Sequence, residues 1–450
     1  MRSFWLCAAL VGGVALLSLS ACSDSSNVGL GVGPDSLKGG QPVTLDITPD
    51  LDTTQTSPIT GDNARQQPLR NQWRFLVGVV DDPIPGTGVI EADGYIDFAG
   101  RSSLPSPIIS AENADSLTAE LRLTPTYLHG DSTDAMNVEV YDLMEEATMD
   151  SARASTSFDA DETDPASVDM AEITPTDSVV VIELRKSWIS DNLEILQDTS
   201  DEGAVFEDDF PGFKIVAPNS EAVAGFSSFS ATLRLTHISD TTTADYPGLK
   251  SFTHIEQRNV SASPPNTHKL LQDGVGVGLS MEWDFDENPL DSLQSDPLNR
   301  AEIFVPVDTL ALQQDYSEPD FTRPLPKGYR LIASRASDPD TPPCAALRLP
   351  IFSAANDACL LPLVPSAAPG AALVSDNVAF TIFQQTFERV RSEQGPILTK
   401  YRVRIADRTS TTINTSSTIQ IGLPSTLPVL VPVDGTDPGP PRATLTVTPL

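Results

Sequence analysis

Stretches in which apolar and polar residues alternate recur along this chain from Trp73 onward. Such alternation places every second side chain on one face, which is typical of a half-buried β-strand. A run of Asp, Pro and Gly after the first stretch indicates a turn that leads into the second. We predict strands at residues 73–80, 89–98, 117–124, 137–144, 178–184, 210–216, 229–238, 298–310, 328–334, 400–407 and 443–450.

Helical spacing appears in two places. Five residues between Trp188 and Leu196 fall on one helical face and predict a short helix, and Val378–Val390 is predicted to be a strand that runs into a short helix. The two halves of the chain repeat a similar order of elements. We therefore predict a mainly β fold with two tandem β-sandwich-like domains, at residues 71–248 and 249–450, and a few short helices.

The N-terminal residues have the pattern of a secretory signal. Arg2 supplies a positive start, and an apolar run from Phe4 to about Leu17 follows. That run is too short to cross the ~30 Å apolar layer of a membrane. It leads to Leu-Ser-Ala-Cys at residues 19–22, which matches the lipobox of bacterial lipoproteins. An ordinary signal peptide with a nearby cysteine is the alternative.

The lipobox predicts that residues 1–21 are a lipoprotein signal peptide and that Cys22 carries the lipid, with palmitate-type acyl chains holding the protein on a membrane. Ser23 rather than Asp follows the cysteine. We therefore expect the outer membrane, on its periplasmic or cell-surface face. Residues 22–70 are rich in Ser, Gly, Asp, Thr and Pro with few aromatics, and we predict a lipidated flexible tether there.

The chain is strongly acidic, with a net charge of −34 and a pI near 4.2. It offers no basic patch that could neutralise phosphates, which argues against a nucleic-acid partner. The acid is spread along the chain rather than gathered in one tail. It fits either a solvated surface that keeps an exported protein soluble or an adaptation to high salt, where screening removes the repulsion.

The cysteines left after Cys7 and Cys22 are Cys344 and Cys359. An even pair in an exported protein favours a structural disulfide. The bridge would close a loop of about 15 residues and stabilise by ~3 kcal/mol in the chain-entropy model. A redox or metal role is the alternative, although no CxxC motif or histidine lies nearby.

Several segments carry a likeness to a known family: the lipobox, Val28–Gly33, Leu76–Gly88, Phe206 with Phe210–Val216, Leu270–Trp283 and Leu298–Asp308. Together they resemble an uncharacterised family of Bacteroidota outer-membrane lipoproteins. The acidic insertion near residues 149–178 and the segment from Cys344 to Cys359 depart from the family. The resemblance implies a surface lipoprotein of unknown activity and supplies no catalytic residues.

Motifs that carry chemistry are sparse. The four histidines have no zinc-ligand spacing, and no GxSxG nucleophile motif occurs. Asp284, Asp286 and Asn288 imitate the first half of a calcium loop, but Pro289 stands where the loop needs glycine. A looser Ca²⁺ site on these three residues is the one cofactor candidate. A weaker acidic cluster is formed by Asp159, Asp161 and Asp164.

We therefore expect a non-enzymatic, lipid-anchored surface protein with a structural or binding role. Its partners would be the membrane, through the anchor, and an extracellular glycan or another surface protein. The alternative is a glycan-binding or glycan-hydrolysing accessory lipoprotein that uses Trp188 or Trp283 as a stacking platform. Core packing is the competing interpretation of both tryptophans.

Overall fold

A computed structural model provides the structure of this chain. It describes residues 41–55, 74–145, 155–168, 171–173, 178–260, 266–287, 289–316, 318–324, 329–334, 360–365, 371–374, 376–392, 400–405, 407–414, 417–423, 425–435 and 439–449. Cys22, Cys344, Cys359 and Asn288 lie outside these ranges, so the predicted lipidation site, the predicted disulfide and one predicted calcium ligand stay predictions.

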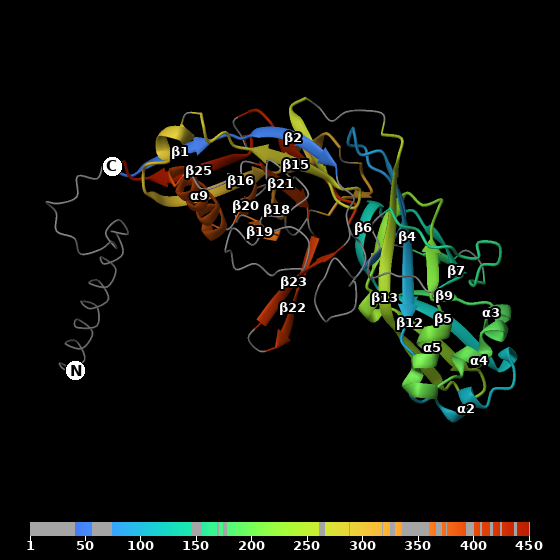
Figure 1. Ribbon diagram of the computed structural model, residues 1–450. Coiled ribbons are helices and arrows are strands. Elements are labelled where there is room, and N and C mark those ends of the chain that lie inside the picture. Colours follow the sequence, from blue (N-terminus) through green and yellow to red (C-terminus); the bar gives the residue numbers. More distant parts are fainter. Residues whose placement is uncertain are drawn as a thin grey trace, which may run out of the picture.

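The described residues confirm the mainly β fold class, since they form two large sheets and one separate hairpin. We call the body built on the 12-stranded sheet the first lobe (Figure 1). Its strands are β3 (Phe75–Asp81), β4 (Val89–Phe98), β5 (Leu117–Leu123), β6 (Pro125–Asp131), β7 (Met136–Asp142), β8 (Ala171–Ile173), β9 (Val180–Glu183), β10 (Phe213–Val216), β11 (Ala222–Phe226), β12 (Thr232–His237), β13 (Thr243–Arg258) and β17 (Phe321–Thr322).

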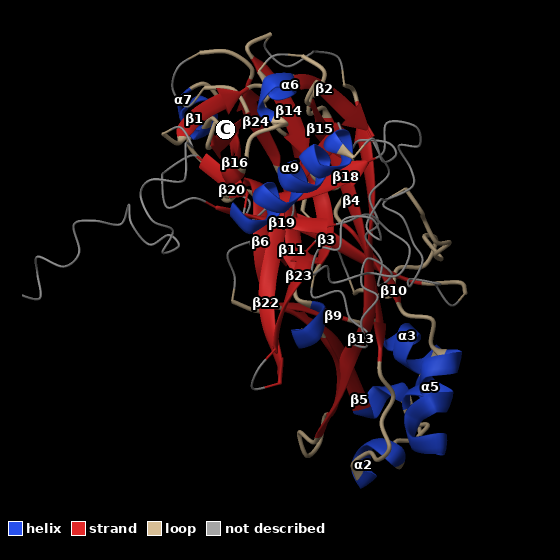
Figure 2. Ribbon diagram, turned by 60° about the vertical axis from the view of Figure 1, so that its left-hand side comes forward, coloured by secondary structure: helices blue, strands red, loops and turns tan. Residues whose placement is uncertain are grey.

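The body built on the 11-stranded sheet is the second lobe, and the two lobes lie end to end (Figures 1 and 2). Its strands are β1 (Val43–Ile47), β2 (Asp50–Gln55), β14 (His268–Gln272), β15 (Val277–Glu282), β16 (Leu298–Pro306), β18 (Tyr329–Ser334), β19 (Leu360–Pro365), β20 (Ala371–Val374), β21 (Lys400–Ile405), β24 (Pro428–Pro432) and β25 (Arg442–Val447). The separate hairpin consists of β22 (Asp407–Asn414) and β23 (Ser417–Leu423).

Helices are few and short in the first lobe, where the sequence predicted one after the strand at 178–184. That prediction is confirmed by α3 (Lys186–Asp191) and α4 (Leu193–Leu196). The other helical elements are α2 (Ser106–Ile109), η2 (Ala114–Ser116), η4 (Ser200–Gly203), α5 (Ala204–Asp209), η5 (Ser228–Ser230), α6 (Leu290–Leu293), α7 (Thr309–Gln314) and α9 (Asp376–Arg391).

The helix α9 corrects one prediction, because Val378–Val390 is helical throughout rather than a strand followed by a helix. Its first residues are β-branched and aromatic, which imitates a strand. The buried positions Ala379, Phe383 and Phe387 instead recur every four residues and join the core of the second lobe. Among the described residues, no helix combines the length and apolar character needed to cross a bilayer.

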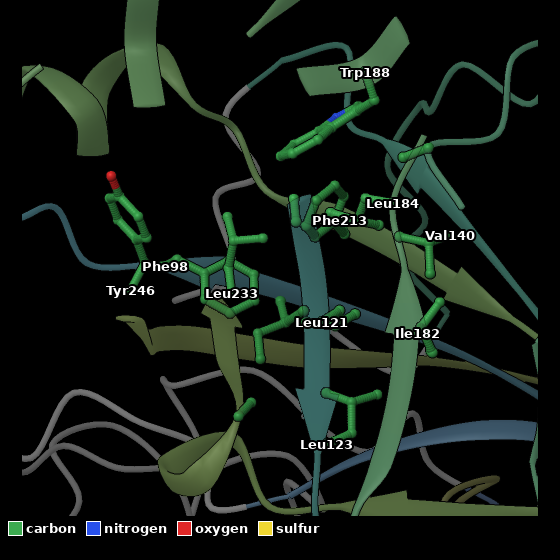
Figure 3. Close-up of a cluster of buried hydrophobic side chains, with 14 of the residues drawn as sticks. Phe98, Leu121, Leu123, Val140, Ile182, Leu184, Trp188, Phe213, Leu233 and Tyr246 are labelled. Carbon is green, nitrogen blue, oxygen red and sulfur yellow. The ribbon is translucent and has the colours of Figure 1, made fainter. Parts of the chain in front are cut away.

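The first lobe folds around one large apolar cluster, which explains the alternation seen in its strands. Leu121 of β5, Ile182 of β9 and Leu233 of β12 face the same interior (Figure 3), and each is at most 1% exposed. Trp188 and Phe213 pack in the same cluster with ring centroids 5.5 Å apart. Burial of these side chains provides the main driving force for this lobe.

The second lobe is closed by the N-terminal residues. Strand β1 pairs with β25, and the sheet continues through successive neighbours to β15, whose far side pairs with β2. Only Thr48 and Pro49 separate β1 from β2, so the two ends of this strand path must meet. The sheet is therefore strongly curved around its core, and residues 43–55 connect its two ends by pairing with β25 and β15.

This closure changes the expected domain limits. Residues 43–55 fall within the segment expected to be a tether, yet they form two paired strands of the second lobe. Their polar side chains face outward on β1, which concealed the strands in a composition-based interpretation. The first lobe is inserted between β2 and β14, and the expected limit at 248/249 falls inside β13.

The acidic, mainly polar composition of residues 149–178 predicts an exposed loop, but part of this insertion packs on the first lobe. Phe158 lies against Tyr95 and Phe252, with ring centroids 5.5 Å from each. Nζ of Lys214, on β10, donates to Oε1 of Glu162 at 2.8 Å, and this ion pair holds the same segment against the sheet. The described residues 155–168 are thus attached to the sheet, to which backbone bonds such as that from the amide of Ala166 to the carbonyl of Val140 also hold them.

Candidate functional site: a buried polar junction between the lobes

The predicted calcium residues that the structure describes do not converge on a third ligand. Asp284 and Asp286 are exposed just after β15, and the amide of Asp286 donates to Oδ1 of Asp284 at 2.9 Å. This bond is an ordinary Asx turn. The calcium site stays a prediction, because Asn288 lies outside the described residues.

One group of three acids does bring its ligand atoms within 4.8 Å of one another in the described part of the chain: Asp131, Asp134 and Glu221. Its geometry follows from a turn, since Oδ1 of Asp131 accepts from the amides of Thr133 and Asp134. The group therefore carries no metal assignment. The weaker predicted cluster is likewise built of turn and surface contacts, with Asp161 bonded to Thr163 and Asp164 to Arg185.

Both candidate tryptophans are core residues. Trp188 is 5% exposed and Trp283 is 1% exposed, and each lies in the apolar cluster of its own lobe. Neither ring presents a face to solvent. The stacking platform that suggested a glycan ligand is therefore not formed by these two residues.

A buried polar junction joins the two lobes. Asp82 follows β3 and accepts from three partners, and both of its oxygens are used. Oδ1 accepts from the amide of Ile84 at 2.9 Å and from Nη2 of Arg323 at 2.8 Å. Oδ2 accepts from Nε of Arg323 at 2.9 Å and lies 2.8 Å from Nε2 of His129.

The other ring nitrogen of His129 leads to the second lobe. Its Nδ1 lies 2.8 Å from Oγ1 of Thr426, which in turn lies 3.1 Å from the hydroxyl of Tyr127. The amide of Thr426 donates to that same hydroxyl at 3.0 Å. Asp82, Tyr127 and His129 belong to the first lobe, whereas Arg323 and Thr426 come from segments of the second.

The bonding pattern assigns the proton on the imidazole. Since the ionised Asp82 can only accept, Nε2 of His129 donates to it. The hydroxyl of Thr426 can then donate to Nδ1 and accept from the hydroxyl of Tyr127. With this assignment, Nδ1 and both hydroxyls each have a hydrogen-bond partner. In this network the negative charge of Asp82 is balanced by the guanidinium of Arg323.

The electrostatics agree with this assignment. Burial alone would raise the pKa of Asp82, but the hydrogen bonds from His129 and Arg323 and the positive charge of Arg323 outweigh it and lower the pKa. Burial also raises the pKa of Tyr127, so its hydroxyl keeps its proton. A buried carboxylate that is bonded on both oxygens and paired with a guanidinium is stable in the ionised form.

Thr426, His129 and Asp82 are arranged like the hydroxyl–imidazole–carboxylate triad of a hydrolase. Their burial, however, argues against nucleophilic catalysis by this hydroxyl. Asp82, His129 and Thr426 are 3%, 0% and 0% exposed. A nucleophile must reach a substrate, and this hydroxyl is enclosed by the lobes on both sides. Asp82 is also compensated by Arg323 rather than reserved for an imidazolium. The arrangement binds one lobe to the other.

No motif or local pattern in the sequence predicts this junction. Its five residues are scattered from Asp82 to Thr426, and the contacts that Arg323 and Thr426 make with the first lobe exist only after the lobes dock. The one local hint is the alternation in β6, which points Tyr127 and His129 to the same buried side. Comparison with protein-family models, with curated proteins and with solved structures found no match.

Proposed function

We propose that this protein is a lipid-anchored outer-membrane protein whose two-lobed β body has a structural or binding role and no catalytic one. The observation that carries the proposal is the lipobox at residues 19–22, which follows a positive start and a short apolar run. The resemblance to outer-membrane lipoproteins points the same way.

The position of β1 supports attachment at the second lobe. The strand begins at Val43, about 20 residues after Cys22, so the lipid stands at most about 70 Å from the first strand. Val43 pairs with Val447, which brings both ends of the folded body together. A body held there would carry its first lobe away from the anchor.

The junction supports the non-catalytic part of the proposal. Its histidine, carboxylate and hydroxyl are consumed by contacts between the lobes. The buried tryptophans also leave the glycan alternative without the platform that suggested it. A glycan array probed with the full chain tests that alternative directly, since a uniformly blank array removes its binding form.

Membrane fractionation of Cys22→Ala tests the anchor, with Cys7→Ala as the matched control inside the apolar run. We expect labelled palmitate and membrane association to be lost for Cys22→Ala and kept for Cys7→Ala. If Cys22→Ala stays lipid-labelled in the outer-membrane pellet, the proposal fails.

A further inference from the structure

Four consecutive residues, Asp320–Arg323, leave the second lobe between α7 and β18 and contact the first lobe, where two of them form a strand of its sheet. The carbonyl of Asp320 accepts from both the amide and the hydroxyl of Ser132, each at 3.0 Å. The next two residues form β17, which adds to the edge of β6 with Phe321 opposite Asp131. Every residue of this segment therefore bonds or pairs with the first lobe.

Arg323 ends the segment and connects three elements. Two of its nitrogens bond the two oxygens of Asp82, and the third donates to the carbonyls of Leu312 and Tyr316 at 3.3 and 3.1 Å. Its side chain is only 7% exposed. The guanidinium also lies over the ring of Phe321, at 5.0 Å from the centroid.

The two lobes do not depend on this segment for their own cores. Each has a large apolar cluster. Apolar contact between the lobes is made by Ile84 of the first lobe, which joins the second lobe's cluster, and by a much smaller cluster that contains Leu427 with Leu76 and Val80. Apolar contact is not directional, so a small apolar patch permits the lobes to slide. Bidentate charged hydrogen bonds are directional and fix a geometry.

We propose that Asp320–Arg323 is a clasp that fixes the angle between the lobes and can be released while both lobes stay folded. Its strand contribution is two residues long, and its strength lies in the Arg323–Asp82 pair. Release would turn a rigid two-lobed body into two bodies joined by flexible contacts. The inference does not depend on the lipid anchor.

Hydrogen exchange on the full chain in detergent tests the clasp, because the amide of Ser132 donates directly to Asp320. We compare wild type, Arg323→Met and the charge-balanced Arg323→Met/Asp82→Asn. The double variant guards against a general loss of folding from an unpaired buried carboxylate. Arg234→Met is the matched control, since Arg234 makes a similar bidentate pair with Asp245 within the first lobe.

We expect exchange at Ser132 to rise about tenfold or more in the double variant, with amides of β4 and β13 unchanged. Small-angle scattering of the same samples should show a broader distribution of interatomic distances. Arg234→Met should change neither reading. Unchanged protection at Ser132 in the double variant, or an equal rise throughout the first lobe, overturns the clasp.

Discussion

The indole nitrogen of Trp188 lies 2.8 Å and 2.9 Å from the two carboxylate oxygens of Asp142, so one donor serves both. Burial raises the pKa of Asp142 to about 6, although the bond from Trp188 opposes the shift. The negative charges that raise the pKa further are those of Asp161, Asp164 and Asp191. Asp142 is thus ionised at neutral pH, and its ionisation lowers the free energy of unfolding.

Replacing Asp142 by Asn should remove this cost. The pKa of the Asp142 carboxyl is near 3.8 in the unfolded chain and about 6 in the folded protein. The protonated carboxyl therefore favours the folded state, and this stability is fully present below about pH 4 and is lost as the pH rises through about 6. At pH 7, Asp142→Asn should be more stable than wild type by up to about 2 kcal/mol, since the half-buried carboxyl is partly screened.

Urea unfolding of Asp142→Asn and wild type at pH 4 and pH 7 measures this difference. The amide oxygen of Asn still accepts from Trp188, so packing is kept. Asp198→Asn is the control, because hydrogen bonds from Ser200 lower the pKa of Asp198 and its removal brings no gain. A variant no more stable than wild type at pH 7 would contradict the prediction.

Thr426→Val should destabilise the protein by about 1–3 kcal/mol, although the side chains are nearly the same size. The substitution leaves Nδ1 of His129 without its hydroxyl donor and removes the hydroxyl that accepts from Tyr127. Thr444→Val is the control, because its hydroxyl bonds Asp46 at the exposed surface. Equal unfolding free energies for the two variants would show that the junction adds nothing.

Much of the sheet structure could be predicted from the sequence, because apolar and polar residues alternate along a strand that has one buried and one exposed face. The strand predicted at residues 89–98 matches β4 from Val89 to Phe98. Glycine favours tight turns, and Gly274 and Gly276 both have positive φ between β14 and β15. These features depend on neighbouring residues alone.

The features that were missed depend on contacts across the chain. β1 exposes most of its side chains, so only its pairing with β25 makes it a strand. β17 has two residues, too few for any pattern. The junction joins Asp82, His129 and Arg323 through docking of the lobes, which no local periodicity records.

Leu445→Ala should cost about 2–5 kcal/mol of unfolding free energy, because Leu445 is fully buried in β25 between β1 and β16. Thr446→Ala changes the outward side of the same strand and should cost far less.

Deleting residues 443–450 should go further and produce aggregates, because β1 and β16 lose the strand between them. A soluble truncated chain that unfolds cooperatively would refute this, as judged by light scattering and calorimetry.

Salt should stabilise this protein if its acidity is an adaptation to high salt. Glu120 and Glu183 lie directly opposite each other on β5 and β9, an arrangement in which like charges repel. The Debye length falls from about 10 Å in 0.1 M salt to about 3 Å in 1 M salt, so such repulsion is largely screened in molar salt.

The melting temperature should therefore rise between 0.1 M and 1 M sodium chloride. Glu183→Gln should melt higher than wild type in low salt and gain less from added salt, because one member of the repelling pair is neutral. Asp284→Asn is a matched control, since its exposed carboxylate accepts from the amide of Asp286. Equal melting temperatures of wild type at both salt concentrations would favour the plain solvated surface, in which the carboxylates only keep the protein soluble.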